Sequence, residues 1–268
     1  MSILRLSCFL LLLLNLTQAR TLETGFLNRQ IKLGKTVYRY QVYVPVEYSK
    51  NEKWPVILFL HGSGERGSDG LLQTEVGLAS AIRRRVAAFK SIVVFPQCPS
   101  NLHWTHDAAK EIALATLEAS IVEFGGDRSR VYLTGISMGG AGTWYLAAEH
   151  SDVFTAIVPI CGWVKPPDGH PITASLPPMV KQICSAPDPY TEIANRIRHI
   201  PVWIFHSKDD GVISVDESRK MYEALSKLRA EVCYTEYEGL GHQAWDKAYS
   251  EPELITWLFG HSTEKHHN

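Results

Sequence analysis

One serine lies between glycines at the point where a predicted strand meets a predicted helix. The run Val131-Tyr-Leu-Thr-Gly-Ile-Ser137-Met-Gly-Gly-Ala-Gly-Thr-Trp144 passes from β-branched and aliphatic residues directly into residues that favour a helix. In this context Gly-x-Ser-x-Gly is typical of a nucleophile elbow, a sharp turn that raises a reactive serine above the edge of a sheet. We therefore predict that Ser137 is a nucleophile on an α/β scaffold. The alternative is a glycine-rich turn without a catalytic role.

The rest of the chain alternates apolar runs with helical patterns. Continuous apolar runs at 56–60, 92–95, 153–160 and 202–205 are typical of strands buried on both faces of a parallel sheet. Before them, two strand-like segments flank Gly34-Lys35 and predict an antiparallel hairpin. The helical patterns lie between the later runs, at 75–89, 107–124, 191–199, 215–228 and 251–259. This alternation predicts an α/β fold with a mainly parallel sheet, helices on both faces and an N-terminal antiparallel hairpin.

Length and proline distribution define the expected domain organisation. The chain has 268 residues, of which 45% are hydrophobic, enough to bury one large core. We expect a single domain over 20–268. The range 165–189 holds seven of the 14 prolines and little periodicity, so we expect an irregular insertion there that serves as a lid or binding loop.

The first 19 residues have the organisation of a secretory signal peptide. Arg5 supplies the positive charge, 8–14 the apolar core and Thr17-Gln18-Ala19 the small-residue cleavage site. The apolar core is too short to cross a bilayer, so no membrane anchor is expected. These features predict a secreted or extracytoplasmic protein.

Net charge bears on the class of partner, and cysteine content bears on disulfide bonding. A net charge of −1 gives no positive footprint for nucleic acid. After signal cleavage four cysteines remain, which permits two disulfides or leaves buried free thiols: Cys98, Cys161, Cys184 and Cys233. The sequence predicts no metal site and no cofactor, and it does not predict an oligomeric state.

A serine nucleophile needs a histidine to take its proton and a carboxylate to orient that histidine. On an α/β scaffold these residues occur in the order Ser, Asp or Glu, His, each after a strand. Ser137, Asp210 and His242 follow this order, each just beyond a predicted strand. Asp209 is the competing carboxylate, because pattern alone barely separates neighbouring residues. His206 ends its strand, so we expect it to be packed or hydrogen-bonded rather than the base.

Two further groups complete the expected site. The loop that begins His61-Gly-Ser63-Gly follows the strand 56–60 and is either a tight turn or an oxyanion loop, and we favour the oxyanion loop. Its donors would be the backbone N–H groups of Ser63 and Met138. Candidates for an acyl or alcohol pocket, each with a core role as the alternative, are Trp104, Trp163 and Trp245. We expect His103 and His106 to line the cleft beside Trp104.

Several motifs together resemble one family. They are Gly-Ile-Ser-Met-Gly-Gly-Ala-Gly-Thr-Trp, His-Gly-Ser-Gly-Glu-Arg-Gly, Pro-Gln-Cys-Pro, Ile-Cys-Gly and Gly-His-Gln-Ala-Trp-Asp-Lys-Ala-Tyr. The chain, over roughly 55–259, resembles the phospholipase/carboxylesterase-like α/β-hydrolases often called "predicted peptidase", which are related to polyhydroxybutyrate-depolymerase-like and feruloyl esterases. The resemblance implies an α/β-hydrolase fold and a serine esterase.

The same resemblance implies which aspartate belongs to the site. The family segment Phe-His-Gly-x-x-Asp-x-x-Val-Pro aligns its acid with Asp210, although Ser207 stands for glycine and Ser214 for proline. Asp209 is then expected to face solvent or to cap the turn.

These observations predict a secreted serine hydrolase that cleaves a small-molecule carboxylic ester through an acyl-enzyme intermediate. A serine peptidase on the same scaffold is the first alternative. A hydrolase-fold binding protein without catalytic activity is the second.

Overall fold

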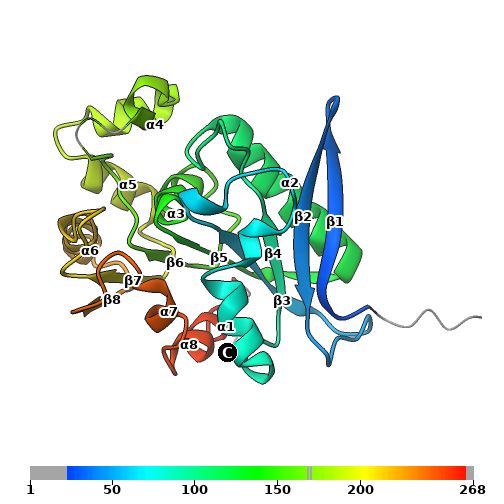
Figure 1. Ribbon diagram of the computed structural model, residues 1–268. Coiled ribbons are helices and arrows are strands. Elements are labelled where there is room, and N and C mark those ends of the chain that lie inside the picture. Colours follow the sequence, from blue (N-terminus) through cyan, green and yellow to red (C-terminus); the bar gives the residue numbers. More distant parts are fainter. Residues whose placement is uncertain (1–22, 168, 170, 264–268) are drawn as a thin grey trace, which may run out of the picture.

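An eight-stranded sheet organises the chain (Figure 1). The computed structural model describes residues 23–167, 169 and 171–263. The predicted signal peptide lies outside these residues. The strands are β1 (Gly25–Leu33), β2 (Thr36–Val44), β3 (Trp54–Leu60), β4 (Ile92–Pro96), β5 (Gly126–Ile136), β6 (Ala156–Ile160), β7 (Val202–Ser207) and β8 (Val232–Tyr237). The α-helices are α1 (Leu78–Arg84), α2 (Asp107–Phe124), α3 (Met138–Glu149), α4 (Pro178–Cys184), α5 (Pro189–Ile197), α6 (Asp216–Lys227), α7 (Trp245–Ala248) and α8 (Leu254–Phe259).

The order of strands across the sheet is β1-β2-β4-β3-β5-β6-β7-β8. β1 and β2 form the predicted antiparallel hairpin, and β2 also pairs antiparallel with β4. All pairs from β4 to β8 are parallel. The carboxyl ends of β5, β7 and β8 therefore lie at one edge of the sheet, where open α/β sheets hold their sites.

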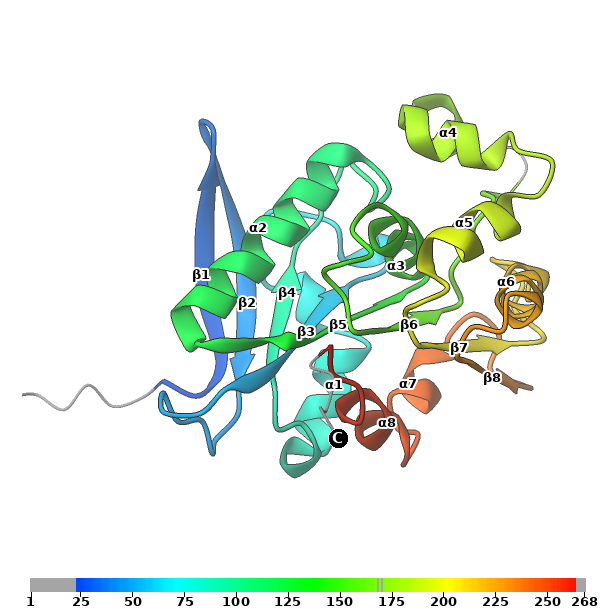
Figure 2. The same cartoon turned by 180° about the vertical axis from the view of Figure 1, so that it is seen from behind.

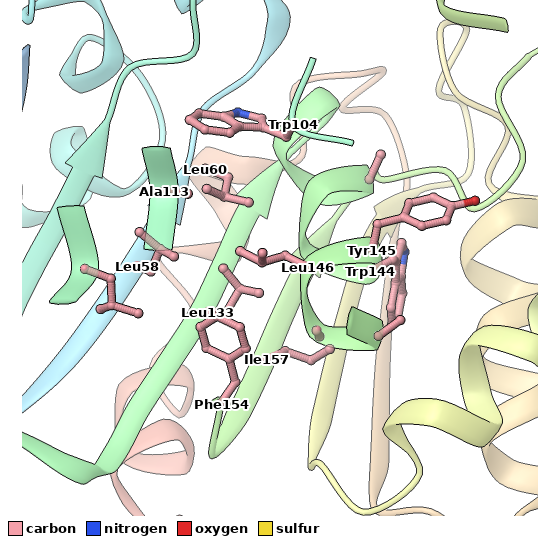
Figure 3. Packing of buried hydrophobic residues seen from close by; sticks show 14 of the residues in the cluster. Leu58, Leu60, Trp104, Ala113, Leu133, Trp144, Tyr145, Leu146, Phe154 and Ile157 are labelled. Carbon is pink, nitrogen blue, oxygen red and sulfur yellow. The ribbon is translucent and has the colours of Figure 1, made fainter. Parts of the chain in front are cut away.

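Side chains of the central strand β3 alternate between two apolar layers. Leu58 and Leu60 contribute to a core shared with α2, α3, α5 and α6, part of which Figure 3 shows. Ile57 and Phe59 point to the other face and pack with α1, α7 and α8. The two views of the ribbon show these helix layers on opposite sides of the sheet (Figures 1 and 2). The predicted α/β-hydrolase architecture, with helices on both faces, is confirmed.

The predicted helix over 75–89 is shorter than the pattern indicated. Only Leu78–Arg84 is α-helical, and short 3₁₀ turns lie before it at Leu72–Thr74 and after it at Val86–Ala88. Gly77 has a φ of +71°, which ends any helical path from the preceding turn. A Cβ at Gly77 would also lie 3.1 Å from the ring of Phe59, so the chain enters α1 in close contact with the sheet.

The range 165–189 is also more ordered than expected. It contains a 3₁₀ helix at Pro171–Ser175 and the helix α4, and α5 begins at its last residue, Pro189. Pro178 and Pro189 each occupy the first position of a helix, where a missing N–H is not needed and the fixed φ suits helical backbone. Two of the prolines in the range expected to be irregular, Pro178 and Pro189, therefore begin helices.

Two further properties of the described residues concern disulfide bonding and the length of apolar helices. Cys98, Cys161, Cys184 and Cys233 are free thiols, so the described fold is held without disulfides. Within residues 23–263, apart from 168 and 170, none of the helices is long and apolar enough to cross a membrane.

Candidate active site

Ser137 lies in the sharp turn between β5 and α3. Its backbone has φ 53° and ψ −114°, a strained conformation for a residue with a side chain. Ser137 N donates to Ile160 O at 2.9 Å, which ties the turn to the neighbouring strand β6. A Cβ at Gly139 would lie 1.9 Å from Leu60 O, so only glycine permits this approach of helix and strand. The geometry is that of the nucleophile elbow predicted from the sequence.

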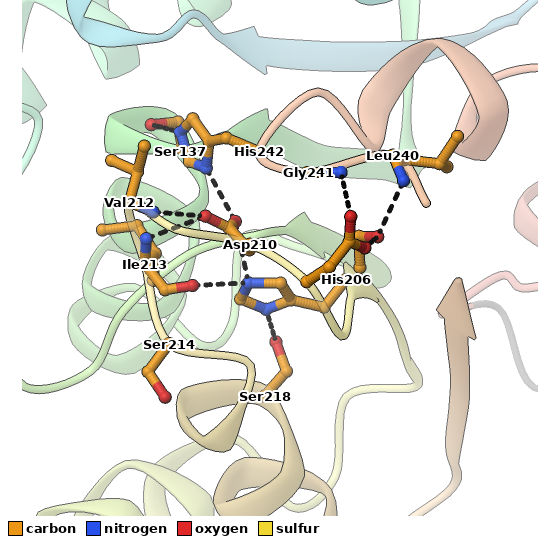
Figure 4. A network of polar contacts seen from close by, with 12 residues as sticks. Ser137, His206, Asp210, Val212, Ile213, Ser214, Ser218, Leu240, Gly241 and His242 are labelled. Carbon is orange, nitrogen blue, oxygen red and sulfur yellow. Dashed lines mark hydrogen bonds and ion pairs between the residues drawn. The ribbon is translucent and has the colours of Figure 1, made fainter. Parts of the chain in front are cut away.

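Three side chains from three strand ends form one hydrogen-bonded chain (Figure 4). His242 Nε2 lies 2.8 Å from Ser137 Oγ, and His242 Nδ1 lies 2.7 Å from Asp210 Oδ2. Because an ionised carboxylate only accepts hydrogen bonds, Nδ1 carries the proton and Nε2 accepts from the serine hydroxyl. The structure thus brings together the three residues that the sequence singled out.

Asp210 is held as a carboxylate. Its side chain is fully buried, and it also accepts from Val212 N at 2.8 Å, Ile213 N at 2.9 Å and His206 Nε2 at 3.1 Å. Burial alone raises the pKa of this group, but the hydrogen bonds from the two histidines and the two backbone N–H groups outweigh it and hold the pKa of Asp210 well below its usual range. These contacts therefore favour the charged form of the carboxylate that His242 meets.

His206 lies beneath Asp210, fully buried at the end of β7. Its Nδ1 is 2.7 Å from Ser218 Oγ of α6, and its Nε2 is 3.1 Å from both Asp210 Oδ2 and Ile213 O. The ring therefore supports the carboxylate from the side opposite His242, as Figure 4 shows. The expectation that His206 is a hydrogen-bonded histidine rather than the base agrees with these contacts.

Asp209 is exposed, but its side chain does more than face solvent. Its carboxylate accepts from Gly239 N at 2.9 Å and Gly241 N at 3.0 Å, in the loop that carries His242. The hydroxyl of Ser207 and these N–H groups lower the pKa of Asp209 to about 2. The expectation that Asp209 only meets solvent or caps its own turn is corrected by these contacts across 30 residues or more.

Ser63 and Met138 border the same cavity as Ser137. Met138 is the first residue of α3, where backbone N–H groups have no partner within the helix and the helix dipole is positive. Ser63 begins a 3₁₀ turn, Ser63–Glu65, directly after β3. The structure thus places both residues at the cavity that Ser137 borders.

Two residues that sequence reasoning did not single out hold the Ser63 loop. Arg66 Nε donates to Ser63 O at 3.0 Å, and its Nη1 donates to carbonyl oxygens of the loop after β4, at Ser100 and Leu102. His61 is fully buried and accepts from Cys98 N at 2.9 Å through Nε2. Burial lowers the pKa of His61 to about 4. Both residues belong to the His-Gly-Ser-Gly-Glu-Arg motif, which was the available signal.

A cavity of about 550 Å³ opens beside Ser137. Its described lining comes from the Ser63 loop, the loop after β4, the range 163–175 and the loop after Asp210, and includes Arg66, Asn101, His103, His106, Trp163, Ile172 and Val212. His103 and His106 line it as expected, and so does Trp163.

The other two tryptophans do not line this cavity. Trp104 is fully buried, and its indole N–H donates to His61 O at 2.9 Å, so the prediction of a pocket role is corrected to a core role (Figure 3). Trp245 packs edge-on against the ring of His242, with centroids 5.6 Å apart. It supports the imidazole from α7 instead of bordering the cavity.

One group of metal-ligand side chains occurs in the described part of the chain: Cys161, Asp210 and His242 have ligand atoms within 4.8 Å of one another. His242 already bonds Asp210 through Nδ1 and Ser137 through Nε2. Burial raises the pKa of the Cys161 thiol, which keeps it protonated and a poor ligand. These side chains fit proton transfer better than metal binding.

The fold and this site define the class of protein, an α/β-hydrolase. More particularly, the chain belongs to the Putative esterase family, whose sequence model matches residues 33–251. A thermostable esterase of known structure is 30% identical, with a TM-score of 0.73 over 89% of this chain and 63% of that one. A ferulic acid esterase is 21% identical, with a TM-score of 0.69 over 89% of this chain and 100% of that one, and shares the fold.

A curated relative extends the comparison. It is an uncharacterized secreted protein of Arthroderma benhamiae, 25% identical over 212 residues, which are 72% of this chain. The present chain spans 22% of the length of that relative.

Proposed function

We propose that this protein is a secreted serine hydrolase that cleaves carboxylic esters of small molecules through an acyl-enzyme intermediate. The observation that carries the proposal is the hydrogen-bonded chain from Ser137 Oγ through His242 to the buried carboxylate of Asp210. Membership of an esterase family and the cavity beside Ser137 support it.

The proposed reaction follows from the positions of the hydrogen-bonding groups. His242 Nε2 takes the proton of Ser137 as Oγ attacks the acyl carbon. Asp210 keeps Nδ1 protonated and stabilises the imidazolium that forms. The N–H groups of Met138 and Ser63 hold the oxyanion, and His242 then gives the proton to the leaving alcohol. A water molecule, activated by the same imidazole, releases the acid and restores the serine.

Secretion is proposed on two grounds. The first 19 residues have the pattern of a signal peptide, and the curated relative is named a secreted protein. We expect the exported protein to begin at Arg20. N-terminal sequencing of protein recovered from the medium checks this, and a retained Met1 would contradict it.

The catalytic proposal is tested with Ser137→Ala. We expect the wild type to hydrolyse short-chain p-nitrophenyl esters and to become labelled at Ser137 by a fluorophosphonate. The variant should lose labelling and at least about 10⁴-fold in kcat, because the proposed acyl-enzyme forms on Ser137 Oγ. Ser100→Ala, which changes an exposed serine bordering the same cavity, is the control and should retain both. Labelling at another serine would overturn the assignment.

A further inference from the structure

The loop that carries His242 is largely exposed, so little packing around it fixes its conformation. Residues 238–240 are exposed, and Gly239 and Gly241 have φ values of +80° and +54°. Glycine makes these left-handed conformations possible, but it also gives the free loop high backbone entropy. His242 follows directly and must stay within hydrogen-bond distance of both Ser137 and Asp210. Something outside the loop has to fix it.

Two side chains at the end of β7 bind three successive backbone N–H groups of this loop. Asp209 Oδ1 accepts from Gly239 N at 2.9 Å, and Asp209 Oδ2 accepts from Gly241 N at 3.0 Å. Leu240 N, between them, donates to Ser207 Oγ at 3.3 Å. Ser207 in turn donates to Asp209 Oδ1 at 2.5 Å, which joins the two acceptors.

The three backbone N–H groups together form a binding site for an anion. Left-handed residues turn successive N–H groups toward one point, a concavity that favours negative charge. Here the anion belongs to the protein itself, and Figure 4 shows Leu240 and Gly241 with their hydrogen bonds on the side of the network away from Ser137. Charge-assisted hydrogen bonds of this kind are about twice as strong as neutral ones.

We propose that Asp209, together with Ser207, is a positioning residue that fixes the backbone of the loop carrying His242. The proposal rests on His242 being the base of the proposed function. The two neighbouring aspartates then have different roles. Asp210 determines the tautomer of the imidazole and stabilises its charge, and Asp209 fixes the position of the loop that carries it. The family that this chain resembles has glycine at the position of Ser207. The hydroxyl of Ser207 therefore gives this chain an additional hydrogen bond between the two segments.

The chain offers a matched control between the same two segments. Lys208 forms an exposed ion pair with Glu238 at 2.6 Å, and these residues adjoin Asp209 and Gly239. Lys208→Ala removes this link between the loops but no acceptor of the three N–H groups. Exposed pairs of this kind contribute little, so activity should stay within about twofold of the wild type.

The test compares Asp209→Ala, Asp209→Asn, Ser207→Gly and Lys208→Ala. We expect Asp209→Ala to lower kcat about 10- to 100-fold with KM nearly unchanged, because misplacing a catalytic group by about 1 Å has an effect of that size. Asp209→Asn keeps one acceptor oxygen and should lose less. Of the three bonds from the loop, Ser207→Gly removes only the bond from Leu240 N to Ser207 Oγ. Its fall in kcat should therefore be smaller than that of either Asp209 variant, but larger than that of Lys208→Ala.

Amide hydrogen exchange supplies a readout that does not depend on activity. Exchange at 239–241 should accelerate in Asp209→Ala and stay as in the wild type in Lys208→Ala. A kcat within twofold of the wild type in Asp209→Ala, or unchanged exchange in this loop, would overturn the proposal. If Asp209→Ala does not fold, Asp209→Asn and Ser207→Gly carry the same comparison. A wild type without esterase activity would overturn the proposed function, while the exchange result would still decide whether Asp209 fixes the loop.

Discussion

Asp209 and Asp210 are identical side chains one residue apart, and their surroundings separate them. Both lie in the turn that follows β7, where Asp210 N donates to Ser207 O at 3.2 Å. From this turn the carboxylate of Asp210 reaches the imidazole, and the carboxylate of Asp209 reaches the backbone of the next loop. Asp210 is buried among two histidines and two N–H groups, whereas Asp209 stays exposed. At the scale of single residues, the site therefore depends on direction as much as on chemistry.

Asp210→Asn tests the role of the buried carboxylate. We expect kcat to fall by about 10⁴, because an amide no longer selects the tautomer with the proton on Nδ1. The thermal midpoint gives the control for folding, and Asp216→Asn, at an exposed carboxylate of α6, should keep wild-type kcat. A loss smaller than tenfold in Asp210→Asn would remove Asp210 from the proposed mechanism.

At the scale of elements, the site requires α3 to lie very close to the sheet. The backbone of Gly140 lies against β6 and the residues after it, so that a Cβ there would be 2.5 Å from Ile160 O and 2.8 Å from Gly162 Cα. Both neighbours are backbone and cannot turn aside. The start of α3, and with it the N–H of Met138, is placed by this contact.

Gly140→Ala should therefore disturb both stability and activity. Overpacking of this kind costs about 1–3 kcal/mol, which corresponds to a fall in Tm of about 2–12 °C for a domain of this size. Differential scanning calorimetry and ester hydrolysis measure the two effects. Gly211→Ala is the matched control, since a Cβ at Gly211 meets nothing within 4 Å. Equal Tm values for the two variants would contradict the close approach.

At the scale of the whole molecule, a buried histidine links stability to pH. His61 accepts from Cys98 N and is fully buried, and burial lowers its pKa to about 4 from an ordinary value near 6.5. Between these values the unfolded chain binds a proton that the folded protein does not. Stability from the neutral ring is therefore complete above about pH 6.5 and is lost as the pH falls toward 4.

This linkage predicts that the free energy of unfolding decreases by about 2 kcal/mol from His61 alone between pH 7 and pH 5. Urea denaturation at the two pH values measures it. His61→Gln should be less stable at pH 7 and should show a smaller decrease, whereas His199→Gln, at an exposed histidine, should keep the wild-type decrease. An unchanged pH dependence in His61→Gln would show that His61 does not supply it.

The sequence by itself determined the elements that depend on short-range pattern. The hairpin, the buried strands and α2 could be predicted because alternating or continuous apolar residues are read directly from neighbouring positions. The order Ser137, Asp210, His242 could be predicted for the same reason, since each residue follows a strand whose end is visible in the pattern. The helix α4, which begins at Pro178, was missed, and the helix predicted over 191–199 begins two residues earlier, at Pro189, because a proline looks the same as a breaker and as a helix start.

Only the tertiary structure decided which atoms meet. Asp209 and Gly241 are 32 positions apart, and their hydrogen bond exists because β7 and β8 are adjacent and parallel. Trp104 is a core residue because the loop after β4 folds its ring against His61, which no local pattern encodes. The burial and the direction of a side chain depend on how the whole chain packs. The residues of the site could therefore be predicted from the sequence, but their contacts could be determined only from the fold.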